Sequence, residues 1–294
     1  MTYPTLTHAR IGLIGLGLMG HGIGRSLLRK GFALSVLGHR NRQPVESLVG
    51  LGAQEATDPA ALARASDVIL ICVTGSPQVE ALIYGENGVL SALQPAQVVI
   101  DCSTSDPRSS ARILADIEAK GGWFVDAPLG RTPVEAEEGR LNTMVGAPSD
   151  LLEAVRPVLA AYCENIVHAG PALSAQKLKL INNFVVVSTT CILAEAIEAG
   201  QLNGVDAAAL YALMSKGPLG GGLLDMILGG AVEGRYDAMK FSVGNAAKDI
   251  GYFNNMMSGQ ARVTRLSQDV SQVMEEAVSR GQAAAYLPEI ARRG

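Results

Sequence analysis

Short apolar runs of strand length recur through the first half of the chain. They occupy residues 11–16, 33–37, 68–73, 98–101 and 123–125, and most are rich in β-branched side chains. Segments with the helical spacing of apolar positions separate them, at residues 20–29, 45–50, 59–65, 77–84 and 106–120. A further run at 143–145 is expected to form another strand, followed by a helix over 149–161. Strands that alternate with helices predict βαβ units, and therefore a doubly wound, mostly parallel sheet.

The pattern becomes helical after Gly170 and Pro171. Residues 173–199 form one long run with helical spacing, and further helical segments follow at 206–215, 223–229, 241–257 and 263–280. The most apolar part, residues 184–202, contains Glu195 and Glu198, which favours a buried helix over a membrane span. The sequence therefore predicts an α/β domain over residues 1–171, and an all-helical domain over residues 172–294 that a long helix connects to it.

Composition adds support for two domains and excludes several classes of partner. A chain of 294 residues is long for a single core. Its net charge of -4 offers no basic surface for nucleic acid or for an anionic membrane. The cysteines and histidines are dispersed without ligand spacing, which predicts no metal site, no disulfide framework and a cytoplasmic location.

A glycine-rich turn follows the first predicted strand. Its residues are Gly15, Leu16, Gly17, Leu18, Met19 and Gly20, and a helix is expected to begin at the last of them. This is the context that the G-x-G-x-x-G fingerprint requires: Gly15 for the tight turn, Gly17 for close approach of the pyrophosphate, Gly20 for helix packing. A glycine turn without a ligand is the alternative. The turn favours a dinucleotide-binding Rossmann domain.

The end of the second predicted strand bears on which dinucleotide binds. In NAD-binding domains this strand normally delivers an acidic residue to the adenosine ribose. Here it leads into residues 37–42, which contain no carboxylate but carry Arg40 and Arg42. Either arginine could meet a ribose 2′-phosphate, so NADP(H) is favoured and NAD(H) stays possible. The alternative is that both are solvated loop charges.

Candidate catalytic residues lie near the start of the long predicted helix. Lys179 and Asn183 are four residues apart and share a helix face, with Asn182 beside them. A lysine and two amides next to a cofactor could polarise a carbonyl group. Lys177 points elsewhere and is the weaker candidate. Taken alone, such a cluster on a helix is more often solvated surface.

Five segments occur in an order that resembles the β-hydroxyacid dehydrogenases, a family that includes 3-hydroxyisobutyrate dehydrogenase, tartronate semialdehyde reductase and, more distantly, 6-phosphogluconate dehydrogenase. They are residues 15–20, 101–107 (Asp-Cys-Ser-Thr-Ser-Asp-Pro), 126–128 (Asp-Ala-Pro), 179–183 (Lys-Leu-Ile-Asn-Asn) and 248–249 (Lys-Asp). The resemblance covers nearly the whole chain. It implies a Rossmann domain joined to a helical domain, and assembly as a homodimer or homotetramer.

The resemblance also implies roles for individual residues. Lys179 would be the catalytic acid/base, and Asn183 would orient the substrate oxygen. Ser103 and Thr104 would lie near the substrate and the nicotinamide, and Lys248 would reach toward the cofactor. Val73 and Thr74, after the predicted strand at 68–73, would also contact the cofactor.

Three positions depart from the usual family pattern. Leu173 and Ala175 replace glycines that often precede the lysine. Gly130, Arg131 and Thr132 replace a Ser-Gly-Gly substrate turn and resemble the sulfolactaldehyde reductase branch, in which the arginine helps to bind the sulfonate. A guanidinium fork suits a sulfonate or a carboxylate, although an exposed loop arginine is the alternative. Val186 stands where that branch tends to have serine.

These observations lead to the hypothesis of reversible hydride transfer between NAD(P)H and a small anionic aldehyde or β-hydroxyacid. The first substrate expected is 3-sulfolactaldehyde or a similar semialdehyde. Substrates of the 3-hydroxyisobutyrate or tartronate semialdehyde type remain alternatives. An imine reductase is disfavoured because such enzymes generally lack the lysine, and a regulatory NADP-binding protein without catalysis is the remaining rival.

Overall fold

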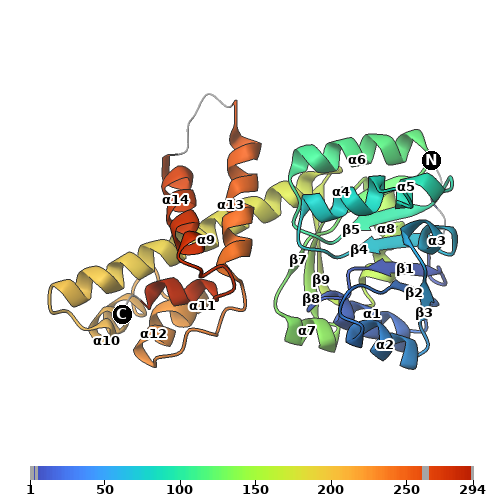
Figure 1. Ribbon diagram of the computed structural model, residues 1–294. Helices are drawn as coiled ribbons and strands as arrows, with labels where there is room; N and C mark the ends of the chain where they lie inside the picture. Colours follow the sequence, from blue (N-terminus) through green and yellow to red (C-terminus); the bar gives the residue numbers. More distant parts are fainter. Residues whose placement is uncertain (1–2, 4–5, 260–264, 293–294) are drawn as a thin grey trace. The chain divides into compact units, whose positions relative to one another are not determined.

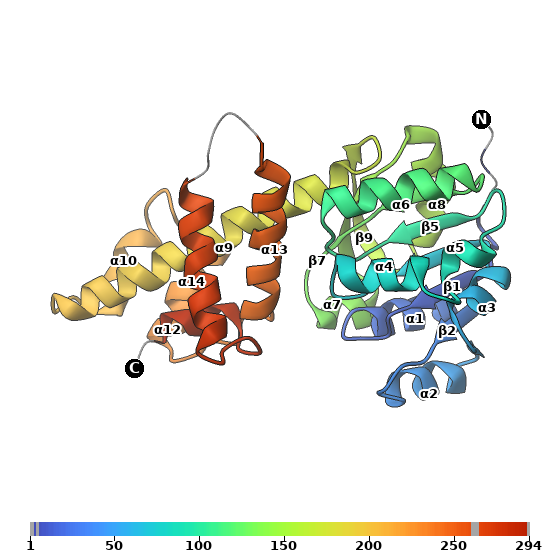
Figure 2. The same cartoon turned by 45° about the horizontal axis from the view of Figure 1, so that its top comes forward.

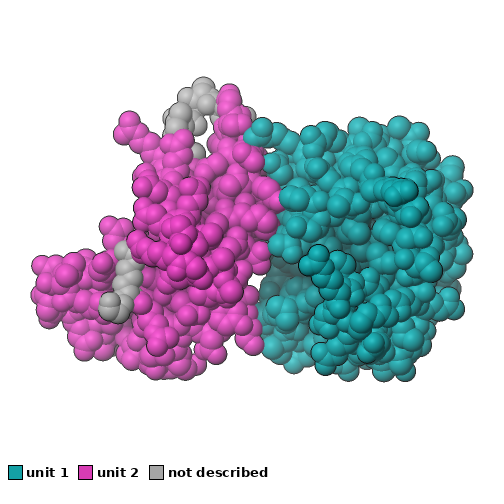
Figure 3. Space-filling view, in the orientation of Figure 1, with its two compact units in different colours: residues 1–179 teal, residues 180–294 magenta. Residues whose placement is uncertain are grey.

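The computed structural model (Figures 1 and 2) describes residue 3, residues 6–259 and residues 265–292. The chain forms two compact units, unit 1 over residues 1–179 and unit 2 over residues 180–294 (Figure 3). The division falls inside one continuous helix, α9 (Ser174–Leu202), so that its first turns belong to unit 1 and the rest to unit 2. The domain junction predicted between residues 171 and 172 lies just before α9 begins.

A single sheet organises the described part of unit 1. Its strands are β1 (Ile11–Ile14), β2 (Leu34–Leu37), β3 (Gln54–Ala56), β4 (Val68–Ile71), β5 (Val98–Asp101), β6 (Trp123–Asp126), β7 (Leu129–Gly130), β8 (Leu141–Gly146) and β9 (Cys163–Gly170). The strand order is β3-β2-β1-β4-β5-β6-β8-β7, with β9 paired to β8. Strands β1 to β6 pair in parallel, and β8 runs antiparallel to β6 and β7. The predicted doubly wound, mostly parallel sheet is confirmed.

Helices cover both faces of this sheet. They are α1 (Gly20–Arg29), α2 (Gln43–Gly50), α3 (Pro59–Arg64), α4 (Ser76–Tyr84), α5 (Val89–Ala92), α6 (Pro107–Ala119), α7 (Pro133–Glu138) and α8 (Ser149–Leu159). One hydrophobic core joins the sheet to α1, α2 and α8, and a second joins it to α3, α4, α5 and α6 (Figure 1). Within β4, Leu70 packs in the first core and Ile71 in the second. Burial on both faces explains why the central strands are continuous apolar runs.

Five elements of unit 1 were not predicted: β3, β7, β9, α5 and α7. Strand β3 has the sequence Gln-Glu-Ala and is largely exposed at the sheet edge. In β9, Cys163 is buried but most of the following residues are exposed or half-buried. These strands form through backbone pairing with β2 and β8 rather than through an apolar stripe. A reading based on hydrophobic periodicity therefore misses them.

Unit 2 is helical throughout its described regular elements, as predicted. Besides its part of α9 they are α10 (Ala207–Met214), α11 (Gly222–Leu224), a π-helical turn η1 (Asp225–Gly229), α12 (Gly230–Val232), α13 (Val243–Met257), α14 (Arg265–Ser279) and a 3₁₀ turn η2 (Leu287–Ala291). One core joins α9 to α13, α14 and η2, and another joins it to α10 and η1. The helix predicted over 263–280 corresponds to α14; residues 263 and 264 lie outside the described residues.

Helix α9 is long and apolar enough to cross a membrane by length and composition alone, a property that core helices of soluble proteins share. Its side chains Val187, Leu193 and Ile197 are buried in the two cores of unit 2. Another stripe, formed by Ile181, Val185 and Ile192, is exposed. The burial of Val187, Leu193 and Ile197 agrees with the prediction of a buried helix in this part of the chain.

Candidate active site

The turn between β1 and α1 requires glycine at two positions, Gly15 and Gly20. Gly15 has φ +97°, and a Cβ there would lie 2.1 Å from the Cys72 carbonyl oxygen. A Cβ on Gly20 would lie 1.8 Å from the Gly15 carbonyl oxygen. At Gly17, by contrast, no described atom lies within 4 Å of the Cβ position. The backbone is therefore open at Gly17, next to the N-terminus of α1, which fits a pyrophosphate.

The two arginines after β2 differ in their surroundings. Arg42 donates hydrogen bonds from both terminal nitrogens to the two carboxylate oxygens of Glu55, each at 2.7 Å. Arg40 lies exposed on the same loop. The Arg42 guanidinium is therefore already paired with a carboxylate.

The loop after β5, residues 102–106, is here called the Ser103 loop. The backbone N–H of Val73, which follows β4, donates to the Ser103 hydroxyl at 3.0 Å. Asp101 accepts from the Ser103 backbone N–H at 2.9 Å and from the Ser105 hydroxyl at 2.7 Å. Burial raises the pKa of Asp101 to about 6, although the hydrogen bonds from these serines oppose the rise. The structure thus brings Ser103 and Val73 together, with Thr74 and Thr104 next to them in sequence.

Asp126, at the end of β6, binds the start of α9. Its Oδ1 accepts the Leu173 backbone N–H at 2.7 Å and its Oδ2 accepts that of Gln176 at 2.8 Å. The Gln176 side chain donates to the Ser103 carbonyl oxygen at 2.8 Å and accepts the Ser105 N–H at 3.0 Å. Sequence reasoning missed Gln176, because a glutamine between Ala175 and Lys177 gives no signal that its side chain is buried.

Lys179 and Asn183 lie on the uninterrupted helix α9, where residues four apart share a face. Lys179 is partly buried and Asn183 is buried. Asn182 is exposed, and its amide donates to the Asn183 side-chain oxygen at 3.3 Å. Lys177 is exposed.

In unit 2, Asp249 of α13 connects two predicted site residues. The Asn183 amide donates to Asp249 Oδ2 at 2.6 Å, and Lys248 Nζ donates to Asp249 Oδ1 at 2.5 Å. Lys248 Nζ also lies 4.8 Å from the centre of the Tyr252 ring. Asp249 is buried, so residues 248–249 are not an exposed helical pair. Asp249 belongs to the Lys-Asp segment named above, but the sequence predicted no role for it.

Hydrogen bonds to neighbouring segments and to the start of α7 hold the turn at residues 130–132. Arg131, with φ 75°, donates from Nη1 to the Arg140 carbonyl oxygen and to the Glu164 carboxylate. Thr132 caps α7: its hydroxyl accepts the Val134 N–H, and Glu135 accepts the Thr132 N–H. A guanidinium has five N–H donors, so two acceptors at Nη1 do not use its full capacity. Gly130 belongs to β7.

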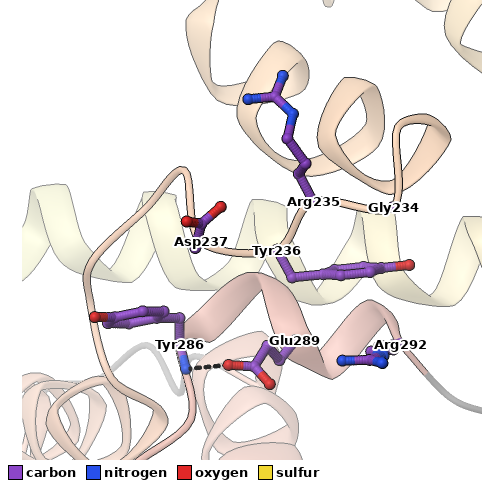
Figure 4. Close-up of a pocket in the computed structure, with 7 residues that line it drawn as sticks. All are labelled: Gly234, Arg235, Tyr236, Asp237, Tyr286, Glu289 and Arg292. Atoms are coloured by element: carbon purple, nitrogen blue, oxygen red, sulfur yellow. Dashed lines mark hydrogen bonds between the residues drawn. The ribbon is translucent and has the colours of Figure 1, made fainter.

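A pocket of about 360 Å³ lies elsewhere in unit 2, between the segment after α12 and η2 (Figure 4). Its lining residues are Gly234, Arg235, Tyr236, Asp237, Tyr286, Glu289 and Arg292. The Tyr286 N–H donates to Glu289 at 3.0 Å, and the Arg292 guanidinium lies 5.8 Å from the Tyr236 ring centre. The two arginines and two acidic residues offset one another in charge, and no predicted site residue lines the pocket.

The described residues contain no group of three or more His, Cys, Asp or Glu side chains that could hold a metal ion. Cys72, Cys102, Cys163 and Cys191 are free thiols. Cys72 lies beside the glycine turn, and burial raises its pKa to about 12. A thiol with so high a pKa is a poor nucleophile, so Cys72 is part of the packing around Gly15.

Comparison with known proteins identifies the relationship. Residues 10–170 match the NAD binding domain of 6-phosphogluconate dehydrogenase, and residues 174–292 match the NAD-binding domain of NADP-dependent 3-hydroxyisobutyrate dehydrogenase. The chain belongs to the β-hydroxyacid dehydrogenase family. This β-hydroxyacid dehydrogenase is therefore an NAD(P)-dependent oxidoreductase that acts on small hydroxyacids or the corresponding carbonyl compounds.

Curated relatives differ in substrate. This chain is 31% identical over 261 residues to NAD-dependent L-serine dehydrogenase of Pseudomonas aeruginosa, a match that covers 87% of each chain. It is 35% identical over 188 residues to 3-sulfolactaldehyde reductase of Escherichia coli, covering 64% of this chain and 63% of the reductase. These relatives support hydroxyacid dehydrogenase chemistry but do not fix the substrate.

Solved structures share the fold. A 3-hydroxyisobutyrate dehydrogenase of Mycobacterium tuberculosis with L-serine aligns with TM-score 0.88 and 21% identity, covering 98% of this chain and all of that one. An imine reductase from Myxococcus stipitatus in complex with NADP⁺ aligns with TM-score 0.62 and 18% identity over 96% of this chain and 99% of the reductase. At these identities the likeness shows the fold alone.

Proposed function

We propose that the protein catalyses reversible reduction of a small anionic aldehyde to a β-hydroxyacid with NADP(H), and that 3-sulfolactaldehyde or a similar three-carbon semialdehyde is its substrate. The observation that carries the choice of substrate is Arg131, between Gly130 and Thr132 in the turn after β7. Its planar fork of donors suits a sulfonate or a carboxylate. The 35% identity to a 3-sulfolactaldehyde reductase supports the same choice.

Lys179 is the proposed acid/base. When bound, the nicotinamide supplies the hydride for the carbonyl carbon. The Lys179 amine donates a proton to the substrate oxygen as that oxygen gains negative charge, and takes the proton back in the reverse direction. A positioned acid of this kind contributes on the order of 10²- to 10⁴-fold to the rate. Asn183 and Asn182 hold the oxygen and the neighbouring hydroxyl, while Ser103, Arg131 and Thr132 hold the acid group.

Most of the proposed cofactor contacts follow the carboxyl ends of the strands β1, β2, β4 and β5 in unit 1. Residues 15–20 hold the pyrophosphate, because their backbone is open at Gly17 beside a helix N-terminus. Val73, Thr74 and Thr104 contact the nicotinamide half, and Lys248 is a further proposed contact. Arg40 binds the ribose 2′-phosphate, because no carboxylate ends β2 and Arg42 is paired with Glu55.

A second candidate is an NAD-dependent enzyme for L-serine or for a carboxylate substrate of the 3-hydroxyisobutyrate or tartronate semialdehyde type. One observation favours it: the L-serine dehydrogenase relative matches 87% of the chain.

We also propose that the protein is a homodimer or homotetramer that associates along α9. The stripe of Ile181, Val185 and Ile192 is exposed, with 54% of Val185 and 56% of Ile192 accessible to water. Exposed apolar stripes of this kind are typical of protein interfaces. Light scattering should find an oligomer for the wild type and a smaller species for Ile192→Glu. A monomeric wild type would contradict the proposal.

A substrate panel with both cofactors tests the proposed function. The purified protein is assayed with NADPH and with NADH against 3-sulfolactaldehyde, methylmalonate semialdehyde, tartronate semialdehyde and a neutral aldehyde of similar size. L-Serine and 3-hydroxyisobutyrate are assayed in the oxidative direction. The proposal predicts the highest kcat/KM for NADPH with the sulfonated aldehyde. A clear preference for NAD⁺ with L-serine would support the second candidate instead.

A further inference from the structure

Asp126 provides a negative charge at the N-terminus of α9, inside unit 1. Its side chain is fully buried, and each carboxylate oxygen accepts one backbone N–H, from Leu173 and from Gln176. The first N–H groups of a helix lack partners within the helix, and a nearby anion stabilises them. Leu173 adopts φ 73°, a left-handed conformation that is unfavourable for leucine. The Asp126 bond to its N–H stabilises this entry into the helix.

Gln176 provides a second connection between α9 and the sheet. It is fully buried, and its amide bonds both the Ser103 carbonyl oxygen and the Ser105 N–H. A buried amide whose oxygen and nitrogen both have partners holds a single orientation, because a rotated amide would lose both bonds. The first turn of α9 is therefore fixed against the Ser103 loop, which follows β5, and against Asp126, the last residue of β6.

Lys179 follows Gln176 by three residues on the same helix. Residues three apart on a helix are neighbours on one face. The contacts of Gln176 and Asp126 consequently determine where the backbone of Lys179 lies relative to the Ser103 loop. Rotation or fraying of the first turn would move the amine and leave the glycine turn unchanged.

We propose that Asp126 and Gln176 are positioning residues, which fix the first turns of α9 so that the Lys179 amine is held in place for proton transfer. The inference rests on the proposed function of Lys179. Neither residue is assigned contact with the substrate or with the cofactor. They affect kcat indirectly, because they fix the position of the helix that carries Lys179.

Gly146 offers a way to disturb the Asp126 carboxylate without changing it. Gly146 pairs with Asp126 across β6 and β8, and a Cβ on Gly146 would lie 2.2 Å from Asp126 Oδ1. Gly146→Ala must therefore displace the carboxylate from α9. Gly50 is a matched control, because nothing lies within 4 Å of its Cβ position. Gly50→Ala is expected to match the wild type.

The test combines hydrogen exchange with kinetics. In Gly146→Ala the backbone amides of Leu173 and Gln176 should exchange faster than in the wild type and in Gly50→Ala. A misplacement of about 1 Å can cost about 100-fold in rate, so kcat should fall about 10- to 100-fold. KM and the Kd for NADPH should each stay within about threefold, because the residues proposed to bind substrate and cofactor are unchanged. Asp126→Asn, which keeps one acceptor oxygen, should give a smaller effect in the same direction.

Several outcomes overturn the inference. Unchanged exchange at Leu173 and Gln176 in both variants shows that the carboxylate does not hold the helix, a result that needs no substrate. If these amides exchange faster but kcat equals that of the wild type, the hydrogen bonds of Asp126 do not position the lysine. A parallel loss of NADPH binding shows general disruption. Failure of the proposed function is distinguishable, because Lys179→Ala would then keep the turnover of the wild type.

Discussion

The guanidinium of Arg131 forms an ion pair with the carboxylate of Glu164, across the turn proposed to bind the acid group of the substrate. Their side chains are 28% and 47% exposed, so water screens the pair. A pair of this kind contributes only about 0.2–1 kcal/mol. A sulfonate or carboxylate from the substrate can therefore replace Glu164 or share the guanidinium with it.

This relationship predicts opposite effects for its two members. Arg131→Ala removes charge-assisted hydrogen bonds, each of about 1.5–3 kcal/mol, so KM for anionic aldehydes should rise about 10- to 100-fold. Glu164→Gln removes a competing carboxylate and should lower the same KM about two- to fivefold. Steady-state kinetics with an anionic and a neutral aldehyde measure both effects. Arg140→Ala, which changes a nearby exposed arginine paired with Glu138, is the control. Equal effects of Arg131→Ala on both aldehydes would exclude an anion-binding role.

The arginines after β2 should contribute unequally to cofactor preference. Arg40→Ala is expected to weaken NADPH binding about tenfold or more and to leave NADH binding nearly unchanged, because only NADPH carries the 2′-phosphate. Arg42→Ala should have a smaller effect, since Glu55 already holds Arg42. Fluorescence titration with each cofactor gives the four dissociation constants. The assignment fails if Arg40→Ala binds NADPH as tightly as the wild type does.

The buried bridge from Asn183 to Lys248 depends on Asp249. Asp249→Ala leaves a buried amide without its acceptor, which typically costs about 1–3 kcal/mol. The free energy of unfolding in urea should fall by that amount, and kcat should fall because Asn183 loses its fixed orientation. Glu276→Gln, at an exposed pair with Arg280, should change the free energy of unfolding by less than about 0.5 kcal/mol. Equal stability of the wild type and Asp249→Ala would show that the bridge does not form in solution.

Asp101 should give unit 1 a distinctive dependence on pH. Burial raises its pKa from 3.8 to about 6, so between these values the folded protein binds a proton that the unfolded chain has released. Its contribution to stability is thus fully present below about pH 4 and lost as the pH rises through about 6, a change of about 3 kcal/mol at 1.36 kcal/mol per pKa unit.

Urea unfolding at several pH values measures this contribution. The wild type should lose stability relative to Asp101→Asn between about pH 4 and pH 6.5, because asparagine does not titrate. The comparison removes the contributions of other carboxylates that titrate in the same range. A difference between the two proteins that stays constant over this range would show that Asp101 has an ordinary pKa.

Much of the fold could be predicted because burial on both faces produces visible sequence patterns. The strands β1, β4 and β5 are fully buried, and each appears as a continuous apolar run. Strand β9 could not be found in this way, because its exposed residues carry no pattern and only pairing with β8 makes it a strand. Periodicity along the sequence indicates which side chains are buried, but it does not indicate which strands pair.

The same limit applies to the candidate site. The glycine turn and the Lys179–Asn183 spacing are local, so the sequence showed them directly. The contacts of Asp126 with Leu173 and Gln176 join residues 47 and 50 positions apart. The partner of Arg131 is 33 residues away, and that of Asn183 is 66 residues away. These long-range hydrogen bonds determine how the residues are oriented, and no spacing within one element encodes them.

The central claim is that the Lys179 amine transfers the proton, and replacement of that amine tests it most directly. Lys179→Ala should lower kcat at least about 100-fold on the preferred substrate while the Kd for NADPH stays within about threefold. Lys177→Ala, which changes an exposed lysine two residues away, should keep wild-type turnover. A Lys179→Ala protein with near-native kcat would contradict the account.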